Sequence, residues 1–144
     1  PPSGQLPGGR HGGSEKVTTS DINGIMLSVH EKWKEEEHLW PAAVVLSRYV
    51  TRHEWVGRAT CVVEVGAGCG LLSLALAAVL GPSMNVVATD CSKEALRNIR
   101  RNAAENKLAG RVRVEEWDWK AELPSWAADI DLLIGSDMVL MLFG

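Results

Sequence analysis

A short run of β-branched residues that passes directly into closely spaced glycines constrains this chain more than any other feature. Residues 61–65 read Cys-Val-Val-Glu-Val and predict a buried strand. Glycine occupies every second position over 66–70, and residues 71–80 are then apolar nearly all round before Gly-Pro ends the run. This order predicts a strand that turns tightly into a buried helix, a unit typical of parallel sheets covered by helices.

The alternation continues along the chain. Further strands are predicted at 85–89, 112–117 and 130–135, and Ser92 can cap a helix over 93–107 that lies between the first two. Strands that alternate with helices predict an α/β fold, here a Rossmann-like, doubly wound parallel sheet with right-handed crossovers. In such a sheet a ligand binds beyond the carboxyl ends of the strands.

The residues ahead of the glycine run predict two smaller elements. An Asn-Gly pair at 23–24 lies between two apolar runs and predicts a β-hairpin over 17–30. A proline near the start and a helical spacing of apolar residues predict a helix over 40–50 that packs on the sheet. Residues 1–16 are rich in Pro and Gly, and we expect them to form a disordered tail before a single domain over 17–144.

An acidic residue stands at the end of the second strand of the sheet. Asp90 follows Gly70 by 20 residues, where a carboxylate can accept both hydroxyls of a ribose. Two simpler interpretations remain, namely a tight strand-to-helix connection and a helix-capping carboxylate. The alternate glycines differ from the G-x-G-x-x-G spacing that seats a pyrophosphate on a helix N-terminus, which disfavours a nicotinamide-dependent oxidoreductase but leaves it as an alternative.

The stretch 64–70, Glu-Val-Gly-Ala-Gly-Cys-Gly, resembles motif I of the class I, seven-β-strand, S-adenosylmethionine-dependent methyltransferases, which has the form E-x-G-x-G-x-G. The resemblance implies that Gly66 and Gly68 line the methionine part of S-adenosylmethionine. It also implies that Glu64 helps position the amino group of this cofactor, directly or through water, and that Asp90 holds its ribose. Cys69 lies near a helix N-terminus, which can lower a thiol pKa, but packing is the role we expect of it.

Three other segments are similar to the protein lysine methyltransferase branch of that family. Asp118-Trp119 follows the third strand, where a carboxylate can accept from the adenine amino group and an indole can stack on its ring. Residues 39–43, Leu-Trp-Pro-Ala-Ala, resemble the Trp-led helix that reaches the cofactor in this branch. A place in the core remains an alternative for Trp40, Trp117 and Trp119.

The third segment, Gly135-Ser136-Asp137-Met138-Val139-Leu140, is similar to the D-x-x-Y element beside the methyl-transfer site. The resemblance implies that Asp137 orients the incoming amine, but Leu140 replaces the tyrosine that helps enclose this amine, which weakens the substrate assignment. The resemblance therefore implies Asp137 as the catalytic residue and the following cofactor-binding residues: Trp40, Glu64, Gly66, Ala67, Gly68, Asp90, Cys91, Asp118, Trp119 and Ser136.

Composition limits the partners. The 144 residues are 46% hydrophobic and carry a formal net charge of -3, so one domain is expected, without the broad basic surface of a nucleic-acid-binding protein. No apolar stretch reaches the roughly 18 residues of a membrane span, and the three cysteines form no CxxC pair. We expect no metal site, no membrane contact and a cytoplasmic location, with the nucleus as a second compartment. The resemblance to the protein lysine methyltransferase branch implies a protein substrate.

The resemblance covers roughly residues 24–140 and supplies four of the family's seven strands, in the order 3-2-1-4. We therefore expect a domain that is incomplete at its C-terminal end, with an apolar, unpaired strand at one edge. The predicted function is transfer of a methyl group to a protein lysine. A non-catalytic interaction module is the main alternative for this chain, and an NAD-dependent oxidoreductase is a weaker one.

Overall fold

A computed structural model describes residues 14–32 and 38–138 of the chain. Its first element is an antiparallel hairpin of β1, Glu15–Ile22, and β2, Ile25–Lys32. Asn23 and Gly24 form the turn with φ of 54° and 91°, and the Gly24 N–H donates to Asp21 Oδ1 at 2.7 Å. Both conformations lie in the left-handed region that Asn and Gly tolerate, so the hairpin predicted from this pair is confirmed.

The predicted tail ended two residues too late. Glu15 and Lys16 already pair with Lys32 and Glu31 in the hairpin. Charge explains the longer strand, because Glu15 forms an ion pair with Arg101 and Lys16 Nζ lies 3.2 Å from Glu31 Oε1. Residues 1–13, which make up the rest of the predicted tail, lie outside the described residues.

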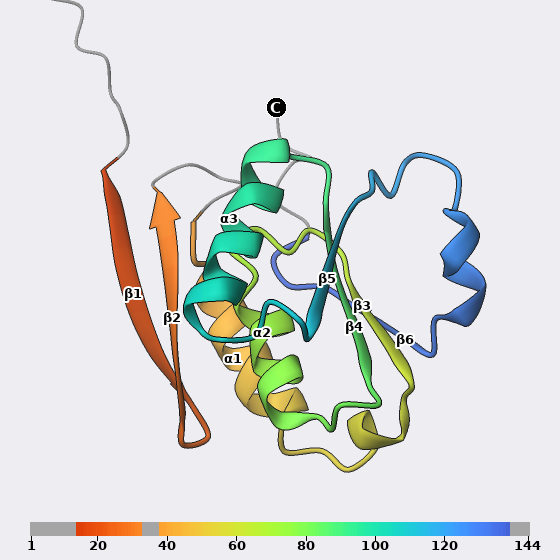
Figure 1. Ribbon diagram of the computed structural model, residues 1–144, viewed down its shortest axis with the longest axis horizontal. Helices are drawn as coiled ribbons and strands as arrows, with labels where there is room; N and C mark the ends of the chain where they lie inside the picture. Colours follow the sequence, from red (N-terminus) through yellow and green to blue (C-terminus); the bar gives the residue numbers. More distant parts are fainter. Residues whose placement is uncertain (1–13, 33–37, 139–144) are drawn as a thin grey trace, which may run out of the picture.

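A four-stranded parallel sheet forms the centre of the molecule (Figure 1). Its order, β5-β4-β3-β6, is the predicted 3-2-1-4 order in the family's strand numbering. The strands are β3 (Cys61–Glu64), β4 (Asn85–Asp90), β5 (Val112–Glu116) and β6 (Leu132–Ile134). Within the described part of the chain β6 pairs with β3 alone, and Leu133 on this edge is 54% exposed.

Three helices, α1 (Pro41–Val50), α2 (Leu71–Val79) and α3 (Lys93–Glu105), cover one face of the sheet (Figure 1). Residues 71–77 of α2 are all buried, because this helix contacts the sheet, α1 and β2. Its apolar character on every side follows from this central place. Ser92 caps α3 as predicted, since its hydroxyl accepts the Ala95 N–H at 3.2 Å.

The hairpin is attached to α3 through asparagine side chains rather than through the main sheet. Asn102 accepts the His30 N–H at 2.8 Å, and Asn106 both accepts from and donates to the backbone of Ser28. Asn98 donates to the His30 carbonyl at 2.8 Å. Asparagines spaced four residues apart on one face of α3 thus form hydrogen bonds with backbone groups on the edge of β2 that does not pair with β1.

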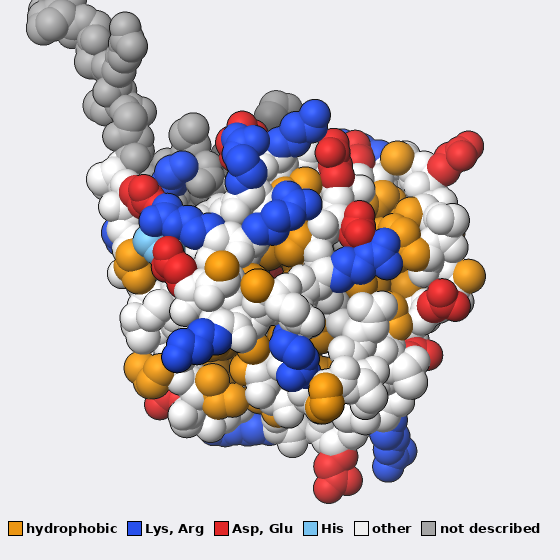
Figure 2. Space-filling view, in the orientation of Figure 1, with side chains coloured by type: hydrophobic (Ala, Val, Ile, Leu, Met, Phe, Trp, Pro, Cys, Tyr) orange, Lys and Arg blue, Asp and Glu red, His pale blue; other side chains and the backbone are white. Residues whose placement is uncertain are grey.

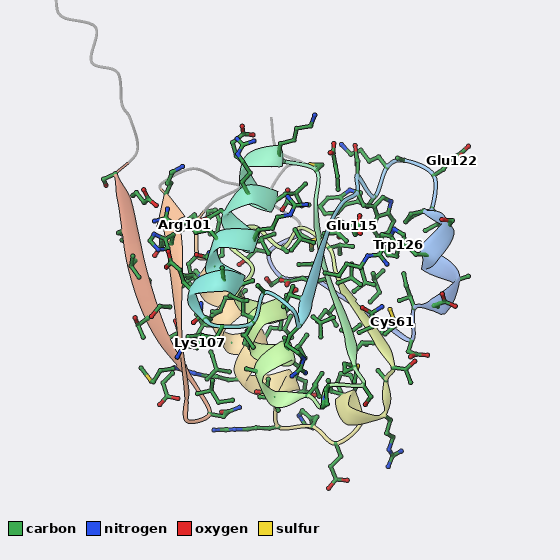
Figure 3. All side chains as sticks on the ribbon, viewed as in Figure 1. Cys61, Arg101, Lys107, Glu115, Glu122 and Trp126 are labelled. Carbon is green, nitrogen blue, oxygen red and sulfur yellow. The ribbon has the colours of Figure 1, made fainter. Side chains whose placement is uncertain are left out.

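The segment between β5 and β6 covers the other face of the sheet and contains the 3₁₀ helix η3, Ser125–Asp129 (Figure 1). Trp126 of η3 packs edge-on against Trp117, with ring centroids 5.9 Å apart, over a small cluster with Val63 and Val87. Figure 3 shows Trp126 on this side. A second 3₁₀ helix, η2 (Val56–Arg58), precedes β3.

Candidate cofactor and methyl-transfer site

The glycine loop has the backbone that its sequence predicts. Gly66, Gly68 and Gly70 have φ of 62°, 55° and 83°, and Gly70 directly precedes α2. These angles lie in the left-handed region, where a side chain costs roughly 1–2 kcal/mol per residue. The strand β3 therefore turns into α2 within six residues because three of them are glycines.

Asp90 holds this loop from the neighbouring strand. Its Oδ2 accepts the Gly68 N–H at 3.0 Å, its Oδ1 accepts the Ser92 N–H at 2.9 Å, and the residue is only 7% exposed. The Ala67 N–H donates to the Thr89 carbonyl at 2.9 Å, which fixes the same loop a second time. Each carboxylate oxygen keeps a lone pair for a further donor. The two motifs that the sequence suggested are thus brought together at the carboxyl edge of the sheet.

Glu64 lies beneath the loop rather than facing outward. It is 2% exposed, and its Oε2 accepts both the Ser73 N–H at 2.9 Å and the Ser73 hydroxyl at 2.5 Å. Burial raises the pKa of the Glu64 carboxyl, the two hydrogen bonds from Ser73 lower it, and the nearby Asp90 raises it. The resulting pKa is about 7. Its carboxyl therefore anchors the first turns of α2, and the predicted contact with a cofactor amino group remains a prediction.

Two side chains close the space over Gly66. A Cβ placed on Gly66 would lie 3.0 Å from Met138 Sδ and 3.2 Å from Trp119 Cζ3. Trp119 is 48% exposed, so it belongs to this loop and not to the core. Sequence reasoning missed Met138, although it directly follows Asp137 in the segment after β6. Gly135 also faces Met138, whose Sδ would lie 3.0 Å from a Cβ there.

The sequence left two roles open for Trp117, a contact with the cofactor or a place in the core, and the structure places it in the core. It packs with Trp126 on the opposite face of the sheet, so it is a core residue. Trp117 and Trp119 lie on different sides because β5 ends at Glu116 and the chain then turns. In this turn the Ala121 N–H donates to the Asp118 carbonyl at 2.8 Å.

The remaining predicted residues surround the same edge of the sheet. Cys91 is exposed directly after β4, and partial burial together with the carboxylates of Asp90 and Asp118 raises the pKa of its thiol. Asp118 is exposed and accepts the Lys120 N–H at 2.9 Å. The buried Ala67 lies in the glycine loop.

Trp40, Ser136 and Asp137 come from the two flanking segments. Trp40 is the half-buried N-cap residue of α1, and its ring meets His38 edge-on with centroids 4.9 Å apart. Ser136 and Asp137 follow β6, and Asp137 is exposed with a φ of 53°. Leu140, the residue in place of the tyrosine, lies outside the described residues. The roles assigned to these residues remain predictions.

Cys69, also in the loop, has a packing role. It is 3% exposed, and burial raises the pKa of its thiol to about 12, so the adjacent helix N-terminus does not activate it. Across the described ranges no three His, Cys, Asp or Glu side chains gather as metal ligands would. Nor does any helix in that part of the chain have the length and apolarity to cross a membrane.

Comparison with known proteins identifies relatives of the chain. The model of a family described as "Lysine methyltransferase" matches residues 21–142. The chain is 29% identical over 119 residues to protein N-lysine methyltransferase METTL21A of Xenopus tropicalis, covering 80% of this chain and 54% of that protein. It is 32% identical over 124 residues to the protein N-terminal and lysine N-methyltransferase EFM7 of Cryptococcus neoformans, covering 79% and 40%.

A solved structure supports the fold. The T. thermophilus 16S rRNA N2 G1207 methyltransferase, solved with AdoMet and guanosine, matches with a TM-score of 0.66 at 18% identity, covering 84% of this chain and 32% of that one. The chain thus has the Rossmann-like methyltransferase fold, and it spans about half the length of the METTL21A sequence that it matches. These similarities do not favour the oxidoreductase alternative.

Proposed function

The chain belongs to the lysine methyltransferase family, and from this premise we propose that it binds S-adenosylmethionine and serves the transfer of a methyl group to a lysine amine of a protein. The bound cofactor would supply the methyl group on a positively charged sulfonium. The names of the two relatives, which both specify lysine N-methylation, support this acceptor.

The observation that carries the proposal is that two carboxyl groups accept N–H groups of the glycine loop and of the first turn of α2. The N–H of Gly68 donates to Asp90 and the N–H of Ser73 donates to Glu64. A pyrophosphate-binding loop instead leaves its N–H groups free for the phosphate oxygens. The N–H groups of Gly68 and Ser73 are thus already used, and they lie next to carboxyl groups, which favours a ligand with a cationic centre and no phosphate.

Different residues at the carboxyl edge of the sheet can bind different parts of such a ligand. Asp90 has acceptor capacity left for ribose hydroxyls, and the half-exposed Trp119 offers an indole face to an adenine. The exposed Asp137 would accept a hydrogen bond from the incoming amine and orient it. Methyl transfer is an in-line displacement, so alignment of the amine matters more than acid–base catalysis.

Calorimetric titration with S-adenosylhomocysteine tests the cofactor site, with NAD as the control ligand. We expect binding of the first ligand alone, and a loss of affinity in Asp90→Ala of about tenfold, the effect of a lost hydrogen bond to a charged group. Asp129→Ala removes an exposed carboxylate of η3, on the face of the sheet opposite the three helices, and should leave binding unchanged. Binding of NAD, or equal affinity of the Asp90 variant, would overturn the assignment.

The transfer itself is tested with tritium-labelled S-adenosylmethionine and a mixed protein extract as acceptor. Label should enter protein and should be lost when the lysine amines of the extract are acetylated beforehand, because an amide nitrogen is not nucleophilic. Asp137→Ala should reduce the label without changing the dissociation constant for S-adenosylhomocysteine. Label that persists in the acetylated extract would refute lysine as the acceptor.

A further inference from the structure

A groove lies between the hairpin and the first turns of α3, outside the site described above. Its cavity volume is about 150 Å³, and its walls come from both elements: Glu15, Lys32, Glu94, Arg97, Asn98 and Arg101. Figure 3 shows Arg101 between β2 and α3. We refer to this cavity and its lining residues as the α3–hairpin groove.

Cations outnumber anions in the lining of the groove. Lys32, Arg97 and Arg101 carry three positive charges against the two negative charges of Glu15 and Glu94, a net charge of +1, in a chain whose net charge is -3. Lys93, Arg97 and Arg101 are spaced four residues apart on α3, and all three are exposed, which places them in one stripe beside the groove. Figure 2 shows Lys and Arg side chains gathered over α3.

The arginines of the groove have partners that hold them but do not use up their donors. Arg97 pairs with Glu94 at 2.6 Å, and Arg101 pairs with Glu15 and Glu105. Their side chains remain 66% and 47% exposed. Exposed pairs of this kind contribute little free energy, and a guanidinium has five N–H donors, so an incoming carboxylate can bind without a large penalty.

The groove opens at the same edge of the molecule as the candidate methyl-transfer site. Lys93 begins α3 three residues after Asp90, and the Ser92 N–H donates to Asp90 Oδ1 at 2.9 Å. In Figure 1 the open end of the hairpin, the start of α3 and the carboxyl ends of the strands lie at the upper side of the molecule. The N-terminal end of α3 adds a partial positive charge there.

We propose that the α3–hairpin groove docks an acidic segment of the protein substrate, so that a neighbouring lysine of that substrate reaches the methyl-transfer site. This inference rests on the proposed function. A peptide with carboxylates beside a lysine matches a groove that mixes Lys32, Arg97 and Arg101 with Glu15 and Glu94. A nucleic acid is the less favoured occupant because the acceptor that we propose is a lysine of a protein, and it is one outcome of the test below.

Fluorescence anisotropy tests the proposal with the whole chain and a labelled peptide in which a run of glutamates flanks one lysine. The double variant Lys32→Gln/Arg97→Gln should bind this peptide about fourfold more weakly, because two exposed ion pairs contribute a factor of about two each. The matched control, Arg52→Gln/Arg58→Gln, removes two exposed cations outside the groove and should bind as the parent does. A peptide with glutamines in place of glutamates should bind weakly to all three proteins.

Equal losses in the two double variants, or equal binding of the glutamine peptide, would overturn the proposal. So would tighter binding of a single-stranded RNA that is lost in the groove variant, since the surface would then recognise nucleic acid. Titration of the same samples with S-adenosylhomocysteine separates this proposal from the proposed function. Cofactor binding without peptide binding overturns the docking groove alone, whereas peptide binding without cofactor binding overturns the function and with it the groove's role in methylation.

Discussion

The replacement Glu64→Gln should change how the stability of this protein depends on pH. Burial raises the pKa of the Glu64 carboxyl from 4.5 to about 7 in the folded chain. The folded state therefore binds the proton more tightly than the unfolded state, and unfolding releases it between these two values. Stability is accordingly lost as the pH rises through this window, and the loss is nearly complete at about pH 8. A glutamine side chain cannot ionise, so the variant lacks this loss.

The two pKa values set the size of the effect. Linkage between about pH 5 and about pH 8 gives a change of about 2.5 kcal/mol in the free energy of unfolding that the variant escapes. The amide can still accept the two hydrogen bonds from Ser73. Any constant difference between the two side chains cancels when the pH dependence alone is compared.

Urea unfolding followed by tryptophan fluorescence, repeated across this pH range, measures the difference between the two proteins. The stability of the variant relative to the parent should increase steadily with pH. Glu122→Gln serves as the control for the removal of one carboxyl group elsewhere, because Glu122 is exposed on the side of the sheet opposite α2 (Figure 3). A constant difference for Glu64→Gln, or one that shrinks as the pH rises, would refute the reasoning.

Three further changes test other parts of the fold by the same measurement. Gly70→Ala should lower stability by about 3 kcal/mol, because the left-handed backbone strains an alanine and its Cβ would lie 3.0 Å from the buried Ile99. The control Gly57→Ala has open space around its Cβ and should lower stability by under about 1 kcal/mol. Asn102→Ala should cost about 3 kcal/mol, since it leaves the buried backbone groups at its amide without partners; a loss below about 1 kcal/mol would contradict this. Burial opposes ionisation of Glu31, but hydrogen bonds keep its pKa below 4.5, so Glu31→Gln should lower stability at neutral pH and the difference should shrink as the pH falls below 4.5; a difference that grows in acid would count against it.

Local chemistry explains why most elements could be predicted from the sequence. The turn at Asn23-Gly24, the cap at Ser92 and the glycines before α2 each need a residue type that few others can replace. The order of the strands was predicted through the family resemblance, and it is confirmed. The start of β1 was predicted too late because its first two residues are charged and are held by ion pairs, Glu15 with Arg101 of α3 and Lys16 with its cross-strand neighbour Glu31.

Contacts between distant residues explain what could not be predicted from the sequence. Asn102 bonds to His30, which is 72 residues away, and nothing near Asn102 in the sequence indicates this partner. Trp117 and Trp119 are two residues apart and would share a face if β5 continued. The strand ends before either of them, so only the tertiary structure shows that Trp119 reaches Gly66 while Trp117 enters the core.

The two carboxyl groups beneath the glycine loop connect the fold to the choice of ligand. Helix N-termini attract anions, so an α/β protein with a bare glycine loop at α2 would bind phosphate there. In this chain Asp90 and Glu64 come from adjacent strands and accept N–H groups of the loop and of α2, which satisfies those donors internally. The same two groups make the surroundings of the loop negative when they are ionised. Two satisfied donors beside these carboxyl groups disfavour a pyrophosphate at this loop, and they fit the cationic methyl donor that we propose as the ligand.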